Sequence, residues 1–352
     1  MSSETETKNQ NPKQTSAGAN FELRMHEQAL GAVNTFSTLC HNSAKFHIGF
    51  LLLFSSLFFV TLLFFPLLSS SSLIAYAIGA LFLTGFSFFS IRLYINAKKP
   101  SQMAEIRMHY IEECKKIVPN SEPAALTHAL YHLVSKLHLI EYQLYKFGRK
   151  SETMGSLLQK FSCYMHWKDA MKMREMLLFV AVQESIQLVK TRPVDVEAHA
   201  ALANGYRKVS HNYLSPFKQS FGQILPWVPK EYDSEQMGAK FKKAAMRAIE
   251  EYKIIDRFAP KELWVHEQMA SIYRDLEKPD EEIREYELIC QLNPKNLQSL
   301  FRLGALYFEQ GMSAKGLQIY EELKRAKDQG AEMLIALYHA LSSEEYALDE
   351  GV

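Results

Sequence analysis

Residues 263–296 read LWVHEQMASIYRDLEKPDEEIREYELICQLNPKN, and residues 297–330 read LQSLFRLGALYFEQGMSAKGLQIYEELKRAKDQG. Both segments are 34 residues long, and similar residues recur at the same positions in each. The spacing extends upstream, because Tyr252, Tyr286 and Tyr320 are each 34 residues apart. A fixed period of this length is the sequence signature of stacked two-helix repeats. The stretch therefore predicts a tandem helical array.

The first helix of each unit carries the same short pattern. It consists of a large residue, a small residue and then a tyrosine, in Met269-Ala270 with Tyr273 and in Leu303-Gly304 with Tyr307. This pattern resembles the tetratricopeptide repeat (TPR) family, whose helix A carries Leu, then Gly or Ala, then Tyr. The resemblance covers about 193–330. It implies an all-α solenoid in which small residues let helices A and B of each unit approach closely.

Several positions depart from the family pattern. His266 and Leu300 stand where Trp is common, and Asp328 stands where a Pro closes the unit. Glu282 and Gly316 replace the small Ala favoured on helix B. Each departure weakens its own unit, yet the register shared by three copies is not expected by chance.

An upstream unit is predicted from Val196, with Leu202-Ala203 and Tyr206 on helix A. Its helix B is expected at Ala248, which lies 45 residues after Ala203 where the family spacing is 12. The extra residues, near 211–238, form either an insertion with a short helix near 216–225 or a degenerate repeat.

Helical periodicity continues on both sides of these units. Region 100–192 is predicted to hold degenerate repeats, with helices over 101–117, 123–147 and 168–191. Residues 331–352 are expected to form a capping helix, over 331–347, and a tail.

Residues 45–99 are predicted to form a transmembrane hairpin. No Asp, Glu, Lys or Arg occurs between positions 46 and 91. Two apolar runs, 48–68 and 73–91, are separated by four serines, and each has about the 20 residues that a helix needs to cross a bilayer. Basic residues flank the hairpin, which predicts cytoplasmic termini by the positive-inside rule. They are Lys45, Arg92, Lys98 and Lys99.

The segment before the hairpin divides in two. Residues 1–20 hold no large apolar residue after Met1 and are predicted to be a disordered tail. Residues 21–44 have apolar positions at helical spacing and are predicted to form an amphipathic juxtamembrane helix. This helix either lies in the membrane interface or packs back on the following domain.

The charge balance excludes a whole-chain nucleic-acid binder. Lys and Arg number 40 against 39 Asp and Glu, giving a net charge of +1, whereas a nucleic-acid binder carries a basic excess. The four cysteines lack the CxxC spacing of a zinc module and are expected to be reduced thiols.

No catalytic residue, cofactor site or metal site is predicted. His128 and His132 have the i, i+4 spacing of a metal pair, but no acidic residue follows His128 as in a zincin. They are interpreted as helix-surface or core histidines. Phosphate-binding loops and the GxSxG nucleophile motif are also missing from the sequence, so neither an enzyme nor a small-molecule substrate is expected.

The TPR resemblance implies a protein or peptide partner in the groove lined by helices A. By motif position, the groove-facing residues are Asn204, Arg207, Lys208, Trp264, Glu267, Ser271, Arg274, Gln298, Phe301 and Phe308.

The sequence thus predicts a membrane-anchored TPR-like scaffold that binds or organises protein partners at the cytoplasmic face of a membrane. The layout of 1–99 also resembles chlamydial inclusion-membrane proteins. That resemblance implies an alternative, a secreted bacterial effector displaying its helical domain to host proteins. A non-catalytic subunit of a membrane or secretion complex is the third possibility. The membrane is accordingly expected to be a bacterial inner membrane or a host vacuole (inclusion) membrane.

Overall fold

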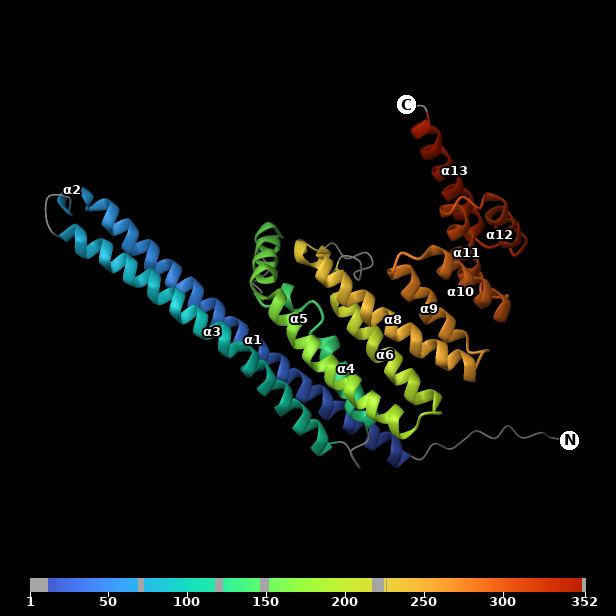
Figure 1. Cartoon of the computed structure of the whole chain (residues 1–352), viewed down its shortest axis with the longest axis horizontal. Helices are drawn as coiled ribbons and strands as arrows, with labels where there is room; N and C mark the ends of the chain where they lie inside the picture. Colours follow the sequence, from blue (N-terminus) through green and yellow to red (C-terminus); the bar gives the residue numbers. More distant parts are fainter. Residues whose placement is uncertain are drawn as a thin grey trace. The chain divides into compact units, whose positions relative to one another are not determined.

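The structure is a computed structural model of the chain, and it describes residues 12–68, 73–117, 123–145, 152–216, 225 and 227–349. Within these ranges every secondary-structure element is a helix, so the predicted all-α class is confirmed (Figure 1). The chain divides into two compact units. Unit 1 comprises residues 1–184 and 212–234, and unit 2 comprises residues 185–211 and 235–352.

Unit 1 begins with a long antiparallel hairpin of α1 (Pro12–Leu63) and α3 (Leu73–Ile117), joined through the short α2 (Phe65–Leu68) (Figure 1). Both long helices are long and apolar enough to cross a membrane, and their most apolar 18-residue windows contain no buried residue. The first predicted run is interrupted, since α1 ends at Leu63 and Pro66 lies in α2. Proline cannot donate the helical hydrogen bond, which favours this break. The serine turn lies outside the described residues.

The other ends of α1 and α3 belong to a folded core. One face of α1 contributes Met25, Ala29, Phe36 and Cys40, which are buried with residues of α3, α4 (Pro123–Lys136) and α5 (Glu152–Thr191). The segment 21–44 therefore packs back on the helical domain. Of the predicted tail, residues 1–11 lie outside the described part of the chain, and residues 12–20 are placed in α1.

The helix predicted over 101–117 is not separate from the hairpin, because α3 runs through Pro100 without a break. Proline removes one backbone hydrogen bond, to the carbonyl of Asn96. Packing supports the helix beyond this point, since Met103, Ile106 and Tyr110 are buried in the unit 1 core. The hairpin and the core thus share continuous helices.

The helix predicted over 123–147 ends early, and the one predicted over 168–191 begins early. After α4 ends at Lys136, Leu139 has φ 54, and the short helix η2 (Ile140–Tyr142) follows. Arg174 on α5 fixes this turn by donating hydrogen bonds to the Leu137 carbonyl at 2.9 Å and to Glu141 at 3.0 Å. Its Nε donates to Asn212 Oδ1 at 3.0 Å. This buried ion pair stabilises an irregular segment that helix periodicity does not reveal.

Unit 2 is a series of antiparallel helix pairs (Figure 1). The described helices are α6 (Val196–Tyr213), α8 (Glu235–Phe258), α9 (Leu263–Asp275), α10 (Pro279–Leu292), α11 (Leu297–Glu309), α12 (Ser313–Arg325) and α13 (Gly330–Asp349). Helices α9 and α11 begin at 263 and 297, the first positions of the two predicted repeats. Between α6 and α8 lies η3 (Lys230–Asp233), whereas most of the short helix predicted near 216–225 lies outside the described residues.

Small residues sit where the helices of a pair meet. Ala203 on α6 is fully buried with Ala245 and Ala248 of α8. On α11, a Cβ atom at Gly304 would lie 2.6 Å from Leu334 Cδ2 and 2.9 Å from Ile319 Cγ2. A side chain at this position would have to displace Leu334 and Ile319. This is the close approach of helices A and B that the TPR resemblance implies.

Candidate functional site

The candidate protein-binding surface is formed by α6, α9 and α11, the first helices of the three repeats, and is called here the helix A surface. Its members were predicted by motif position on helices whose bounds match the repeat. The exposed members are Asn204, Lys208, Glu267, Arg274 and Gln298.

Arg207 connects two of these helices instead of facing solvent. Its guanidinium on α6 donates hydrogen bonds to the Gln268 side chain and, at 3.3 Å, to Ser271 Oγ on α9. The predicted residues Arg207 and Ser271 are therefore brought together. Gln268 was missed, because its motif position is not among those that the family pattern assigns to the groove. Arg207 therefore aligns α6 with α9, and these two bonds occupy part of the guanidinium that was predicted to face a ligand.

Trp264 lies at the junction of α8 and α9. Its ring is half-buried and meets the ring of Tyr252 edge to face, with centroids 6.1 Å apart. The indole Nε1 donates a hydrogen bond to Glu262 Oε2 at 3.1 Å. The Trp264 position predicted for the groove therefore presents only part of its ring.

The two aromatic residues predicted for the third unit belong to the core. Phe308 is only 5% exposed, and its ring centroid lies 4.8 Å from that of Tyr338 on α13. Phe301 is half-buried in the same cluster. Interpreting Phe308 as a groove-facing residue is thus wrong, because the capping helix covers it.

Two charged pairs occupy the positions that depart from the TPR pattern. His266 on α9 bonds Glu285 on α10 at 2.8 Å and lies 3.5 Å from Asp256 on α8. Glu282 on α10 is paired with Arg302 on α11 at 3.2 Å. Burial raises the pKa of both Glu285 and Glu282, and the histidine and the arginine oppose that rise. These pairs hold neighbouring helices together, so the raised pKa values of Glu282 and Glu285 have a structural cause.

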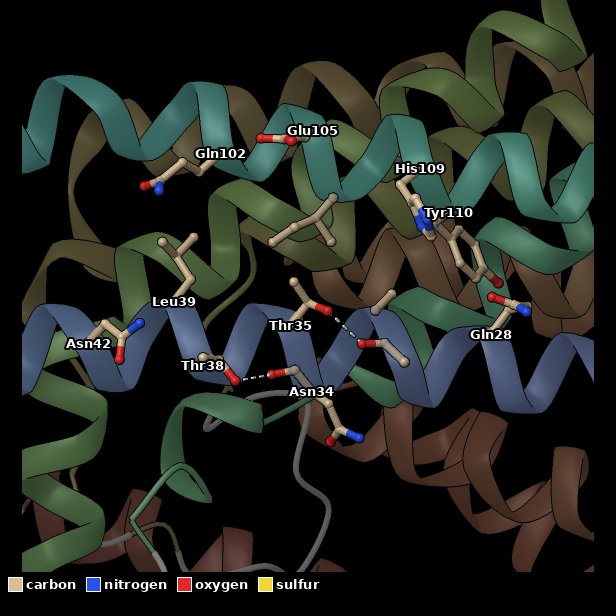
Figure 2. Close-up of a pocket in the computed structure, with 13 residues that line it drawn as sticks. Gln28, Asn34, Thr35, Thr38, Leu39, Asn42, Gln102, Glu105, His109 and Tyr110 are labelled. Carbon is tan, nitrogen blue, oxygen red and sulfur yellow. Dashed lines mark hydrogen bonds between the residues drawn. The ribbon is translucent and has the colours of Figure 1, made fainter.

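A cleft of about 740 Å³, lined by both polar and apolar groups, lies between α1 and α3, and Figure 2 shows its lining. The hydroxyls of Thr35 and Thr38 donate hydrogen bonds back to their own helix, to the carbonyls of Gly31 and Asn34. Amide and carboxylate groups line it at Gln28, Asn34 and Asn42 on α1 and at Gln102 and Glu105 on α3, and the rest of the lining includes Leu39, Ile106, His109 and Tyr110. Sequence reasoning missed this cleft, because nothing in the sequence shows which faces of α1 and α3 meet.

A second cavity, of about 450 Å³, is apolar and lies beside the predicted spans. The hairpin contributes Phe50, Phe54 and Phe88, and the first part of α5 contributes Phe161 and Met165. Further exposed apolar side chains lie on the same part of α5, at Leu157 and Tyr164. Apolar surface thus continues from the hairpin onto α5.

The histidine pair considered from the sequence does not form a ligand cluster. His128 is exposed on α4, and the ring of His132 lies 5.5 Å from that of His26. Among the described residues, three potential metal ligands do converge, from positions far apart in the sequence. They are Cys40, His166 and Asp169.

Comparison with known proteins adds fold similarity only. No protein-family model matches the chain, and no curated protein matches it. Solved structures similar to it include three TPR proteins. The thermophilic TPR protein TTC0263 of Thermus thermophilus is 15% identical over 61% of this chain and 98% of its own, with a TM-score of 0.30.

Two further TPR structures have TM-scores of 0.24. The TPR2AB domain of yeast Sti1, in its pHSP90 complex, is 14% identical over 69% of this chain and 96% of its own. The P58(IPK) TPR domain is 13% identical over 91% of this chain and 99% of its own. Because all three scores are low, the description of unit 2 as TPR-like rests on the 34-residue register and the helix pairs within this chain.

Proposed function

We propose that this protein is a membrane-anchored scaffold that binds protein partners on the helix A surface of its repeats. One observation carries the proposal. The exposed apolar parts of α1 and α3 continue, within the same two helices, into a buried core. The segment suited to a bilayer and the folded domain are therefore one continuous structure.

The exposed side chains support a bilayer as the surroundings of the hairpin. Soluble proteins seldom expose contiguous apolar patches larger than a few hundred Å². Here large apolar side chains are exposed along both antiparallel helices, among them Leu52, Phe59, Leu62, Phe82 and Leu83. Insertion of the hairpin into a lipid bilayer would remove these apolar side chains from water.

Charge supports the orientation. Because α1 and α3 are antiparallel, Lys45 lies at the same end of the hairpin as Arg92, Lys98 and Lys99 (Figure 1). The sequence that joins the two helices at the other end, residues 69–72, consists of four uncharged serines. The positive-inside rule then favours cytoplasmic positions for both termini and for the repeats.

Aromatic residues support a membrane interface at the base of the hairpin. Tyr164 on α5 lies against Trp227, with ring centroids 6.0 Å apart, and Phe161 lines the apolar cavity beside the spans. Tyr and Trp are enriched where hydrocarbon meets headgroups. We infer that the beginning of α5 rests on the bilayer surface.

The partner is proposed to be a protein or a peptide. Asn204, Glu267 and Arg274 offer an amide, an acid and a base on the exposed side of α6 and α9. Membrane confinement raises the effective concentration of partners on the same surface, so weak binding suffices. No catalytic step is part of the proposal.

Cysteine labelling tests the topology. Cys290 is replaced by Ser, since the three other cysteines are buried, and Ser70→Cys or Lys261→Cys is introduced. In sealed spheroplasts a membrane-impermeant maleimide should label the variant at 70, while the variant at 261 should need lysis. Labelling of position 261 in intact cells would exclude the proposed orientation.

Charge reversal tests the partner surface. In membranes, the wild-type protein should cross-link to its partner proteins. Full-length protein carrying Glu267→Lys with Arg274→Glu should no longer cross-link to them. The matched control is Lys243→Glu, an exposed reversal on α8 outside the helix A surface. Equal cross-linking by all three proteins would exclude this surface as the binding site.

The finer assignment concerns which membrane is involved. The layout of residues 1–99 supports an inclusion-membrane protein whose helical domain faces the host cytoplasm. Fractionation of infected cells distinguishes the candidates, because an effector leaves the bacterium, whereas a scaffold or a secretion-complex subunit stays in its envelope.

A further inference from the structure

Three potential metal ligands meet where the hairpin joins the unit 1 core. Cys40 lies on α1, and His166 and Asp169 lie on α5. Their ligand atoms are all within 4.8 Å of one another. Cys40 is 1% exposed and His166 is 0% exposed, whereas the Asp169 side chain is 17% exposed, so two of the three ligands are enclosed by protein.

The two ring nitrogens of His166 have different surroundings. Nε2 lies 2.6 Å from the hydroxyl of Tyr145. Nδ1 is buried without a hydrogen-bond partner and lies 3.8 Å from Asp169 Oδ2. A buried polar atom without a partner is rare in folded proteins and calls for an explanation such as a bound ion.

We propose that Cys40 Sγ, His166 Nδ1 and a carboxylate oxygen of Asp169 bind a zinc-class divalent ion. Sulfur, imidazole nitrogen and carboxylate oxygen are the ligands that zinc takes in proteins. With bonds of about 2.0–2.3 Å, tetrahedral ligands lie roughly 3.3–3.8 Å apart. For a nitrogen and an oxygen ligand the separation is about 3.3–3.5 Å, so the Nδ1–Oδ2 separation of 3.8 Å needs to close by a few tenths of an ångström, and the widest separation by about 1 Å.

Tyr145 fits the role of a supporting residue. If its oxygen accepts the Nε2 proton of His166, the lone pair is left on Nδ1, which faces the cluster. Metal-bound histidines almost always donate their second N–H in this way. The hydrogen bond thus orients the ring for a metal.

Cys40 is a poor nucleophile when no metal is bound. Burial, with a further contribution from Asp169, raises the pKa of its thiol to about 12. Without a metal the thiol stays protonated, and its burial gives a substrate no access. A bound cation would stabilise the thiolate directly.

Lys99 is the group with which the metal competes. Its ammonium lies 2.7 Å from Asp169 Oδ2, and both side chains are largely buried. The lysine neutralises the carboxylate when no metal is bound. Metal binding must release this contact, or use the other carboxylate oxygen. Since α1 carries Cys40, the occupied site would join α1 to α5, whereas α3 stays joined through Lys99 only if the lysine keeps one oxygen of Asp169.

Metal analysis of the full-length protein in detergent tests the proposal, with zinc as the probe. After dialysis against zinc and then metal-free buffer, we expect about one zinc per chain. His166→Ala should abolish binding, and Tyr145→Phe should weaken it roughly 10–100-fold. Lys99→Met should bind zinc more tightly than the wild type, because the competing ammonium is gone. Cobalt in place of zinc should show a thiolate charge-transfer band that Cys40→Ser removes.

Cys163→Ser is the matched control, since Cys163 is as buried as Cys40 but lies outside the cluster. It should keep full binding and the cobalt band. Wild-type protein without bound zinc would overturn the proposal, and so would zinc binding that survives His166→Ala. Neither result depends on membrane topology or on the partner surface, so failure here is distinct from failure of the proposed function.

Discussion

Arg302 on α11 donates hydrogen bonds from Nε and Nη2 to the same carboxylate oxygen of Glu282 on α10, at 3.3 and 3.2 Å. Glu282 is 3% exposed and occupies the helix B position where TPR units favour a small alanine. The ion pair therefore satisfies a charge that the repeat pattern does not accommodate. It also joins the second repeat (α9 and α10) to the third (α11 and α12), since the two residues belong to successive repeats.

Removing the arginine should destabilise this junction. Arg302→Met leaves Glu282 buried without its cation, which costs up to about 3–5 kcal/mol for fully buried pairs. Because the Arg302 side chain is 29% exposed, we expect about 2–3 kcal/mol here. Hydrogen exchange of the α10 and α11 amides in the full-length protein measures the loss.

The double variant Glu282→Ala with Arg302→Met is the control for this pair. It installs the small residue that the family favours and removes both charges, so protection of α10 and α11 should recover most of its wild-type value. If the double variant is as destabilised as Arg302→Met alone, the unpaired carboxylate is not the cause.

Gly316 on α12 and Phe308 on α11 form a second compensating pair. A Cβ atom at Gly316 would collide with the Phe308 ring. Alanine normally stabilises a helix by up to about 1 kcal/mol relative to glycine, whereas overpacking costs about 1–3 kcal/mol. Gly316→Ala should therefore lower the stability of the third repeat, which hydrogen exchange would detect as faster exchange of the α12 amides.

Replacing the ring should reverse that effect. In Phe308→Leu the clash is relieved, so adding Gly316→Ala should cost much less than it does in the wild type. Gly238→Ala on α8 is the matched control, because nothing lies within 4 Å of its added Cβ. It should be neutral or slightly stabilising. An equal loss at both glycines would show that the Phe308 contact is irrelevant.

The periodic part of the fold could be predicted from the sequence. Helices α9 and α11 begin at the first residues of the two repeats, because one apolar stripe and small contact residues recur every 34 positions. The two apolar helices of the hairpin could also be predicted, because their charge-free runs are visible in consecutive residues. The continuity of α3 through Pro100 could not be predicted, since it depends on the burial of Met103 and Ile106 against other helices.

The site residues show the same division. Motif position identified Asn204, Glu267 and Arg274 as exposed, but it could not show that Arg207 bonds Gln268 or that α13 covers Phe308. Those facts depend on contacts between helices. Likewise, Cys40 and His166 are 126 positions apart, so no spacing motif signals their meeting.

Charged residues within the spans should prevent stable membrane integration. Arginine at the centre of a membrane helix costs about 2.5–3.5 kcal/mol on the insertion scale, so Phe58→Arg with Leu83→Arg costs about 5–7 kcal/mol. The double variant should become extractable by alkaline carbonate. Leu288→Arg with Leu317→Arg, on exposed positions of α10 and α12, should stay in the membrane pellet. Retention of both proteins would count against the spans.

His199 on α6 lies 2.7 Å from Glu251 on α8. This contact should make the stability of the first repeat, α6 with α8, depend on pH. Burial alone would lower the pKa of His199, but hydrogen bonds to Glu251 and to the Pro193 carbonyl raise it above its usual value. A folded-state pKa above the unfolded value of about 6.5 means that the folded state binds the proton more tightly. The stabilisation is complete below about pH 6.5 and is lost as the pH rises through the folded-state pKa.

Replacing the imidazole with a neutral amide removes this dependence. His199→Gln should therefore lower the protection of α6 and α8 amides more at pH 6 than at pH 8, after correction for intrinsic exchange rates. His128→Gln, at an exposed histidine of α4, controls for loss of an imidazole elsewhere and should leave those amides unchanged. A destabilisation by His199→Gln that is equal at both pH values, or larger at pH 8, would mean that the charged imidazole does not stabilise this helix pair.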